Sequence, residues 1–284
     1  MQKNISSIIN DDLFTKIYNR EFINKRSLDD SILYNHLENT FLEAFDLIKE
    51  NKLEESKTLF NNGEKLFPKK DNEDVFGLIL NDTLYPKKAY LYYREGKIRL
   101  AGYLTLRSII TNQKIKEKSG VDLPVFVQIQ QYQNISVICF KTKYFSEGII
   151  LNCRLLLFLF TKKDVGVKYL SHFAFTDKTE ESGLKCSMAY QIVFATIQNL
   201  YRIKNKRYLY SFIEFVSNIL SEFAPEFENE MVLKEFLETI SQYDSEKYSE
   251  NAADFIEKNK DVLFPGTTSI LTVINKIYEN EKVI

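Results

Sequence analysis

Three residues in the first half of the chain have the types that a metal-dependent nuclease uses. Asp82 and the triplet Glu95-Gly96-Lys97 supply two carboxylates that could hold Mg²⁺ and a lysine that could contact a phosphate. This chemistry requires residues 88–104 to form a β-hairpin, which would bring the three side chains to adjacent strand ends. If the same residues are helical, the triplet is an ordinary turn between two helices, and Glu-x-Lys arises by chance in a chain rich in both residues.

Cys186 and His172 are the residues that could carry thiol chemistry. Cys186 follows a polar stretch, residues 176–183, and is expected to begin a helix, where the helix dipole lowers the pKa of a thiol. His172 would serve as its base. No oxyanion hole and no third residue that orients His172 can be identified, so an ordinary cysteine at a helix start is the alternative.

Two stretches rich in basic residues and tyrosines could bind nucleic acid. Residues 86–118 contain nine Lys/Arg against two Glu, a local charge of +7, with four tyrosines among them. A shorter cluster of the same kind covers residues 201–210. Such side chains could contact phosphates and stack on bases. The alternative is that the charges solvate helix faces while the tyrosines pack inside, since the basicity of a whole domain is absent.

The composition favours helices as the elements that position these residues. The 284 residues include only 9 Gly and 5 Pro, whereas an all-β fold with many tight turns needs more of both. The net charge is −1, so no global field attracts nucleic acid or a membrane. The most apolar segment, residues 148–160, is shorter than the ~20 residues that span a bilayer and contains Arg154.

Cysteine usage and the N-terminal residues indicate the compartment. Cys139, Cys153 and Cys186 lie far apart and form no C-x-x-C pair, which fits a reducing environment. The first residues contain no apolar run of signal-peptide length. We expect a cytoplasmic protein. With two histidines and no glycine-rich phosphate loop, we expect no cofactor and no metal.

Residues 40–68 have the pattern of two amphipathic helices joined by a turn at Asn51. Small residues stand where the helices would touch, at Ala44, Ser56 and Gly63, and Pro68 closes the unit. A second hairpin is predicted from residue 85 to about residue 110. In both units the key positions step by 3, 4, 5 and 4 residues. These positions are Ala44, Leu47, Asn51, Ser56 and Phe60 in the first unit and Ala89, Tyr92, Gly96, Ala101 and Thr105 in the second.

Both units resemble tetratricopeptide repeats. In that family a small residue and an aromatic stand in the first helix, Gly at the turn, and Ala and an aromatic in the second helix. The resemblance covers about residues 37–68 and 82–111 and implies helical hairpins in series. The sequence departs from the pattern at Thr40, where the family prefers a large ring, and at Ser56, where it prefers Ala. The units also lie 45 residues apart, where the family has 34.

The middle of the chain allows two interpretations. Alternating apolar residues from 125 to 139 are typical of strands, but the spacing also suits buried helices. We predict a helix pair at 124–142 and 145–161, with a small β element within 121–160 as the alternative. Further helices are expected at 184–201, 207–223, near 227–242 and 249–260, and at 268–278.

The fold class that these patterns predict is all-α, an irregular array of helical hairpins or α-solenoid. The polar, basic stretch 112–122 contains Gly120 and is the best break in the chain. It suggests an N-terminal helical region, 1–118, with the two hairpins, and a C-terminal helical region, 119–284. One continuous solenoid is the alternative.

We expect a non-enzymatic helical-repeat protein, a scaffold or regulatory subunit that binds a protein or peptide in a groove between hairpins. A nucleic-acid-binding or nuclease accessory protein that uses residues 86–118 is the alternative. Self-association is a further expectation, since residues 222–261 hold twelve Asp/Glu against four Lys and could pack on the basic 86–118 of another copy. The candidate partner-binding residues are Tyr92, Tyr93, Arg94, Lys97, Arg99, Arg202 and Arg207.

Overall fold

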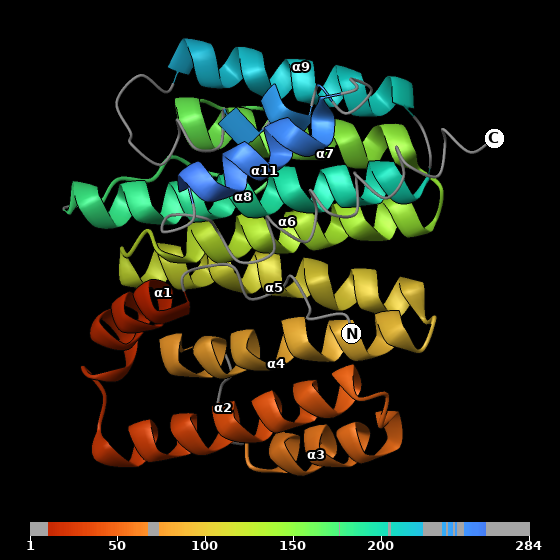
Figure 1. Ribbon diagram of the computed structural model, residues 1–284. Coiled ribbons are helices and arrows are strands. Elements are labelled where there is room, and N and C mark those ends of the chain that lie inside the picture. Colours follow the sequence, from red (N-terminus) through yellow and green to blue (C-terminus); the bar gives the residue numbers. More distant parts are fainter. Residues whose placement is uncertain are drawn as a thin grey trace. The chain divides into compact units, whose positions relative to one another are not determined.

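The computed structural model (Figure 1) describes residues 11–67, 74–175, 177–203, 206–223, 235–236, 238–240, 242 and 247–259. Its elements are all helices, and no strand occurs among these residues, which confirms the predicted all-α fold. The elements are α1 (Asp11–Tyr18), the π-helix η2 (Asn19–Ile23), α2 (Leu28–Lys49), α3 (Leu53–Lys65), α4 (Val75–Arg94), α5 (Ile98–Ser119), α6 (Pro124–Lys141), α7 (Phe145–Thr161), α8 (Lys178–Arg202), α9 (Lys206–Phe223) and α11 (Tyr248–Asn259).

The chain divides into two compact units. The N-terminal unit comprises Asp11–Leu151 and Gly166–Thr176, and the described residues of the C-terminal unit begin with Asn152–Val165 and continue from Asp177. Helix α7 therefore contributes residues to both units. The predicted division of the chain into 1–118 and 119–284 stays a prediction.

The helices of the N-terminal unit pack mainly on their neighbours in the chain. Helix α2 packs on α3, α4 on α5, and α5 on α6, while α4 also contacts both α2 and α3. Consecutive antiparallel helices with short connections are what the scarcity of glycine and proline predicted. Phe41, Phe60, Ile79 and Phe126 are among the side chains that this packing buries completely.

Three hairpin turns in the N-terminal unit share one geometry. Asn51, Gly96 and Lys143 are left-handed, with φ of 65°, 76° and 69°. In each turn the amide of the next residue donates to the carbonyl four residues before the left-handed position, which ends the first helix. These bonds are Lys52 N to Leu47 O at 2.9 Å, Lys97 N to Tyr92 O at 2.8 Å and Tyr144 N to Cys139 O at 2.9 Å. All three turns lie on one edge, on the right in Figure 1.

The turn at Lys143 joins α6 and α7 into a third hairpin, which repeats the spacing of the first two. Counted from the left-handed residue, Ser136 stands at the position of Ala44 and Ala89, and Gly148 at that of Ser56 and Ala101. All these residues are buried. A Cβ on Gly148 would lie 3.2 Å from the Ser136 carbonyl oxygen, so α6 and α7 approach closely at this small pair.

Gly63 is the small residue with the tightest surroundings. A Cβ built on it would lie 2.4 Å from Phe41 Cε1 and 2.9 Å from Cζ. The Phe41 ring stacks on Phe60, with centroids 5.7 Å apart, and meets the edge of Phe67 at 6.2 Å. The predicted contact between the two helices at Gly63 is therefore confirmed.

The predicted helix pair is confirmed, because residues 124–141 and 145–161 form α6 and α7, and the alternative, a small β element within 121–160, is excluded. The prediction of where the second hairpin begins was wrong, because it begins earlier than residue 85. Helix α4 starts at Val75 with Asp74 as its N-cap, which accepts a 2.6 Å bond from Gly77 N. The helix continues through Pro86, although proline has no amide hydrogen to donate within it.

Helix α8 begins earlier than the helix predicted at 184–201, since most of the polar stretch 176–183 belongs to it. Asp177 Oδ1 accepts a 3.2 Å bond from Glu180 N, the arrangement of an N-cap residue and the third residue of a helix. Two acidic residues in the first turn complement the positive end of the helix dipole. Glu181 is buried and forms ion pairs with Lys162 and, at 3.0 Å, with Lys178.

The C-terminal unit has its own apolar core. The Tyr190 ring of α8 stacks on Phe236 at 5.7 Å, and Phe236 lies 6.0 Å from Phe255 of α11. Asn152 donates a 2.7 Å bond to Thr196, a buried polar link between α7 and α8. Residues 248–259 confirm the helix predicted near 249–260, and the helix predicted at 268–278 lies outside the described residues.

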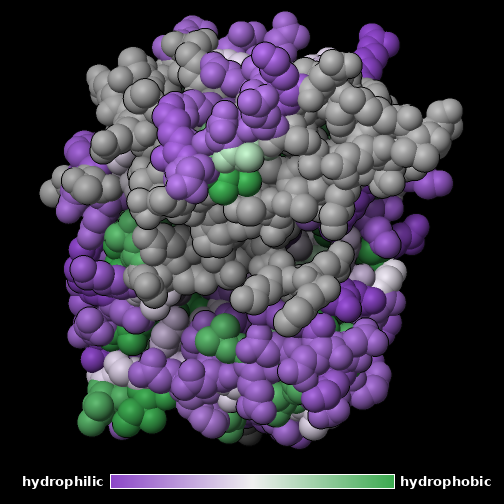
Figure 2. Space-filling view, viewed as in Figure 1, coloured by the Kyte–Doolittle hydropathy of each residue, from purple (hydrophilic) through white to green (hydrophobic). Residues whose placement is uncertain are grey.

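The described surface is mostly hydrophilic on the face shown in Figure 2, where hydrophobic residues lie in small, separate groups. Leu28, Ile32 and Tyr144 are among the large apolar side chains that solvent reaches. Apolar residues scattered in this way are normal for a protein surface. None of the helices in the described part of the chain could span a membrane.

Candidate partner-binding surface

A row of half-buried aromatic rings crosses from α2 to α4 in the N-terminal unit. The Phe45 ring lies 5.2 Å from Tyr90, and Tyr90 stacks on Tyr93 at 6.3 Å between centroids. Lys49 Nζ lies 4.4 Å from the Phe45 centroid, and the Arg94 guanidinium lies 5.8 Å from that of Tyr90. We call these five residues the aromatic strip. Both cations are exposed, and Lys49 also pairs with Asp46 at 2.8 Å, so the strip presents apolar area edged by charged side chains, with Arg94 as a positive one.

The two hairpins build this strip from equivalent positions. Phe45 and Tyr90 stand six residues before the left-handed residues of their turns, and Lys49 and Arg94 stand two residues before them. Residues four apart share one helix face, so each ring lies next to its own cation. Because α2 packs on α4, the two pairs meet. Three members, Phe45, Lys49 and Tyr90, are absent from the predicted site, although aligning the hairpins on their turns would have revealed them.

The structure brings five of the predicted partner-binding residues to one end of the α4–α5 hairpin. Tyr93 and Arg94 belong to the aromatic strip. Lys97 Nζ lies 5.8 Å from the centroid of Tyr92, and Arg99 is exposed in the first turn of α5. The remaining two, Arg202 and Arg207, are exposed at the end of α8 and the start of α9, and both belong to the C-terminal unit.

Part of the positive charge of residues 86–118 is neutralised within the N-terminal unit. Four of the nine cations form ion pairs, three of them with carboxylates outside the stretch, while the partner of Lys97, Glu95, is already counted in the local charge of +7. These pairs are Lys87–Glu38 at 3.1 Å, Lys88–Glu64 at 2.6 Å, Lys97–Glu95 at 3.1 Å and Lys116–Asp122 at 2.8 Å. The local charge of +7 in the sequence therefore overstates the positive field at this surface.

The nuclease arrangement is not formed. Residues 75–94 are a continuous helix, so Asp82 lies about 20 Å along the axis from Glu95, at 1.5 Å per residue. Glu95 accepts a 2.5 Å bond from Lys57, which, together with Lys97, lowers the pKa of its carboxyl. No group of three or more His, Cys, Asp or Glu side chains suited to a metal occurs among the described residues.

The thiol arrangement also loses its physical basis. Helix α8 begins at Lys178, so Cys186 lies in its third turn and not at its start. The effect of the helix dipole falls off within the first turn, and Cys186 lies beyond it, so the expected position at a helix start does not hold. His172 is exposed in the N-terminal unit, and Cys186 belongs to the C-terminal unit.

Asp82 instead forms a buried polar cluster between α4 and α5. Ser108 donates to Asp82 Oδ1 at 3.0 Å, and Asn112 Nδ2 donates to the same oxygen at 2.5 Å. Burial raises the pKa of Asp82 to about 6, although both hydrogen bonds act to lower it. The Tyr18 hydroxyl and the Asn112 carbonyl oxygen are buried without hydrogen-bond partners. The cluster is a structural feature with a titratable centre.

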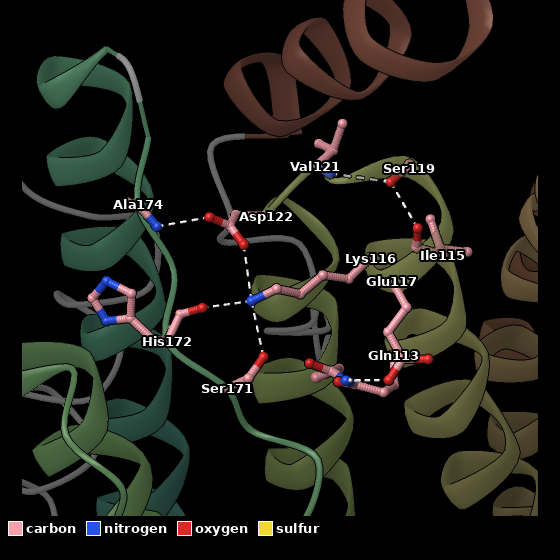
Figure 3. A network of polar contacts seen from close by, with 11 residues as sticks. Gln113, Ile115, Lys116, Glu117, Ser119, Val121, Asp122, Ser171, His172 and Ala174 are labelled. Atoms are coloured by element: carbon pink, nitrogen blue, oxygen red, sulfur yellow. Dashed lines mark hydrogen bonds and ion pairs between the residues drawn. The ribbon is translucent and has the colours of Figure 1, made fainter.

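Lys116 binds the segment 171–175 to α5 (Figure 3). Its ammonium lies 2.8 Å from Asp122 Oδ1 and donates to Ser171 Oγ at 2.8 Å and to the His172 carbonyl at 2.5 Å. The other Asp122 oxygen accepts a 2.8 Å bond from Ala174 N. Between these contacts Phe173 is fully buried, with its centroid 5.1 Å from that of Phe126.

Replacing Lys116 with methionine should destabilise the N-terminal unit by about 1–3 kcal/mol, because it removes two hydrogen bonds from a charged donor and the ion pair with half-buried Asp122. Hydrogen exchange of the amides of residues 171–175 should become faster, and mass spectrometry of peptic fragments would measure it. Lys118→Met is the matched control, since Lys118 is exposed on the same helix. Unchanged exchange in the Lys116 variant would show that the burial of Phe173 and the bond from Ala174 N to Asp122 hold the segment without Lys116.

Comparisons with protein families, curated proteins and solved structures found no match to this chain. The resemblance to tetratricopeptide repeats therefore stays a prediction.

Proposed function

We propose that this protein is a helical-repeat scaffold or regulatory subunit that binds a segment of a partner protein along the aromatic strip. The observation that carries the proposal is the row of half-buried rings shared by two hairpins, with an exposed cation at equivalent positions of each. Apolar side chains of the partner would pack on the rings, and its carboxylates would meet Lys49 and Arg94.

The ring geometry supports binding better than a purely structural role. Aromatic side chains provide large contact area at low cost in conformational entropy, and interfaces are enriched in Tyr and Arg. Here Arg94 is oriented by a 3.1 Å bond to the Tyr90 hydroxyl, so part of its ordering cost is met before a partner arrives. The internal pairing of the cations in 86–118 supports a protein partner over nucleic acid.

The double variant Tyr93→Ala/Arg94→Glu should lose the partner. The test is affinity capture from the native lysate with the tagged full chain, performed with and without nuclease. We expect discrete proteins that persist after nuclease with the wild type and are depleted at least about tenfold with the variant. Lys65→Glu, an exposed charge reversal on α3, is the control and should capture as the wild type does. Capture that disappears with nuclease would favour nucleic-acid binding instead.

A further inference from the structure

The outer face of α5 carries large apolar side chains in solvent. Leu100, Tyr103 and Leu106 are 47%, 53% and 43% exposed. They stand three residues apart, so they form a continuous stripe on one side of the helix. The opposite face of α5, which includes Ala101 and Thr105, is buried. Three large apolar residues exposed within seven positions of one helix are more than the scattered exposure that is normal for a surface.

Helix α3 shows that the fold does not require an apolar outer face. Counted from the left-handed turn residues, the positions of Leu100, Tyr103 and Leu106 correspond to Glu55, Thr58 and Asn61 of the first hairpin. All three of these α3 residues are exposed as well. The same geometry therefore carries ordinary polar residues in one hairpin and large apolar residues in the next. The difference lies in the chemistry that α5 offers to solvent.

Positive charge flanks the stripe. Arg99 and Arg107 are exposed, at positions where α3 has Glu54 and Asn62. Arg107 is oriented by the hydroxyls of Tyr103 at 3.4 Å and Tyr85 at 3.3 Å, and its guanidinium lies 5.6 Å from the Tyr85 centroid. The acidic residue within α5 is Glu117, near the far end of the helix.

We propose that the outer face of α5 is a docking surface for an acidic amphipathic helix of a partner protein. The three apolar residues span about 9 Å along the helix, which suits one or two turns of a packed helix with apolar residues at intervals of three and four. Acidic residues at the edges of that helix would meet Arg99 and Arg107, so the charges are complementary. The proposal rests on the partner-binding function above but uses a surface on a different helix from the aromatic strip.

The closing experiment exchanges one outer face for the other. The face-swap variant, Leu100→Glu/Tyr103→Thr/Leu106→Asn, gives α5 the residues that α3 carries at these positions. Because all three positions are exposed, it should keep the helix content and melting temperature of the wild type. Arg107→Glu is the second variant, so that the test does not depend on the folding of the first.

The probe is a synthetic, fluorescently labelled amphipathic peptide of about six helical turns with leucines on one face and glutamates elsewhere. Its counterpart has glutamine in place of every glutamate. We expect the wild type to bind the acidic peptide in an anisotropy titration. The counterpart peptide, the face-swap variant and Arg107→Glu should each weaken binding at least about tenfold. Lys65→Glu, the exposed charge reversal on α3, should bind the acidic peptide as the wild type does.

Each other outcome overturns a stated part of the proposal. Binding that survives the face swap removes α5 as the docking surface, and equal binding of the two peptides removes the charge complementarity. A dimer at low salt that becomes a monomer in the face-swap variant, measured by light scattering, would assign the face to the acidic residues 222–261 of a second copy. If the wild type captures proteins from lysate but does not bind the acidic peptide, the docking surface on α5 is ruled out and the proposed function still stands.

Discussion

At pH 7.5 the Asp82→Asn variant should be more stable than the wild type by about 3 kcal/mol. Burial raises the pKa of Asp82 from 3.8 to about 6 in the folded chain, and each pKa unit corresponds to about 1.4 kcal/mol. At neutral pH the folded wild type therefore holds an ionised carboxylate that is better solvated in the unfolded chain. Asparagine keeps an oxygen that accepts the bonds from Ser108 and Asn112 and carries no charge.

The stability difference between Asp82→Asn and the wild type should depend on pH in a direction set by the raised pKa of Asp82. The contribution of a protonated Asp82 to stability is fully present below pH 3.8 and is lost as the pH rises through 6, because the folded state holds its proton more tightly. The advantage of the variant should thus shrink to about 1 kcal/mol at about pH 4.5. The nearby charges alter the pKa of Asp82 only in part, because Lys87 lowers it and Glu38 raises it.

Urea unfolding followed by far-ultraviolet circular dichroism at several pH values would measure the difference, since the chain has no tryptophan. Asp46→Asn is the matched control, because the Asp46 side chain is 66% exposed and pairs with an exposed lysine. Its effect should be small at every pH. A difference between Asp82→Asn and wild type that does not vary with pH would contradict the raised pKa.

Gly63→Ala should destabilise the N-terminal unit by about 1–3 kcal/mol, the usual cost of overpacking a core. The added methyl carbon would lie 2.4 Å from Phe41 Cε1, which no real contact allows. Phe41 is fully buried between Phe60 and Phe67, so its ring cannot turn away without displacing them. This cost outweighs the gain of up to about 1 kcal/mol that alanine brings to a helix interior.

Gly102→Ala provides the control with the opposite sign. Gly102 also lies within a helix, but no atom is found within 4 Å of a Cβ built on it. This variant should be stabilised by about 0.5–1 kcal/mol, because alanine has the higher helix propensity. Thermal unfolding of the two variants side by side would measure both effects. Equal shifts of the melting temperature in the same direction would contradict the close contact at Gly63.

Local patterns were sufficient to predict the hairpins. The 3, 4, 5, 4 spacing placed small residues at Ala44 and Ser56 and turns at Asn51 and Gly96, and both turns are left-handed in the structure. Such predictions succeed because a turn between two helices is formed by residues that are close in the chain. The same spacing is present around Lys143, but it is hard to recognise because lysine is an unusual residue for a left-handed turn.

The sequence patterns were ambiguous where a local signal had two meanings. The stretch 176–183 is polar enough to lie outside a helix, yet Asp177 and Glu180 form the start of one. Apolar alternation after residue 124 suits a strand as well as a helix that is buried on both faces, and the predicted helix α6 is the one that forms. Asp82 is a candidate metal ligand by its type alone, and its burial could not be known from its neighbours.

The sequence by itself determined the all-α class and the positions of the hairpins, because helix periodicity and turn residues are local properties. Only the tertiary structure decided which charges are free to meet a partner. Lys87 pairs with a residue 49 positions away and Lys116 with Ser171, 55 positions away. The aromatic strip likewise needs α2 to lie against α4. Contacts between distant residues depend on how the helices pack, and helix packing is a property of the whole unit.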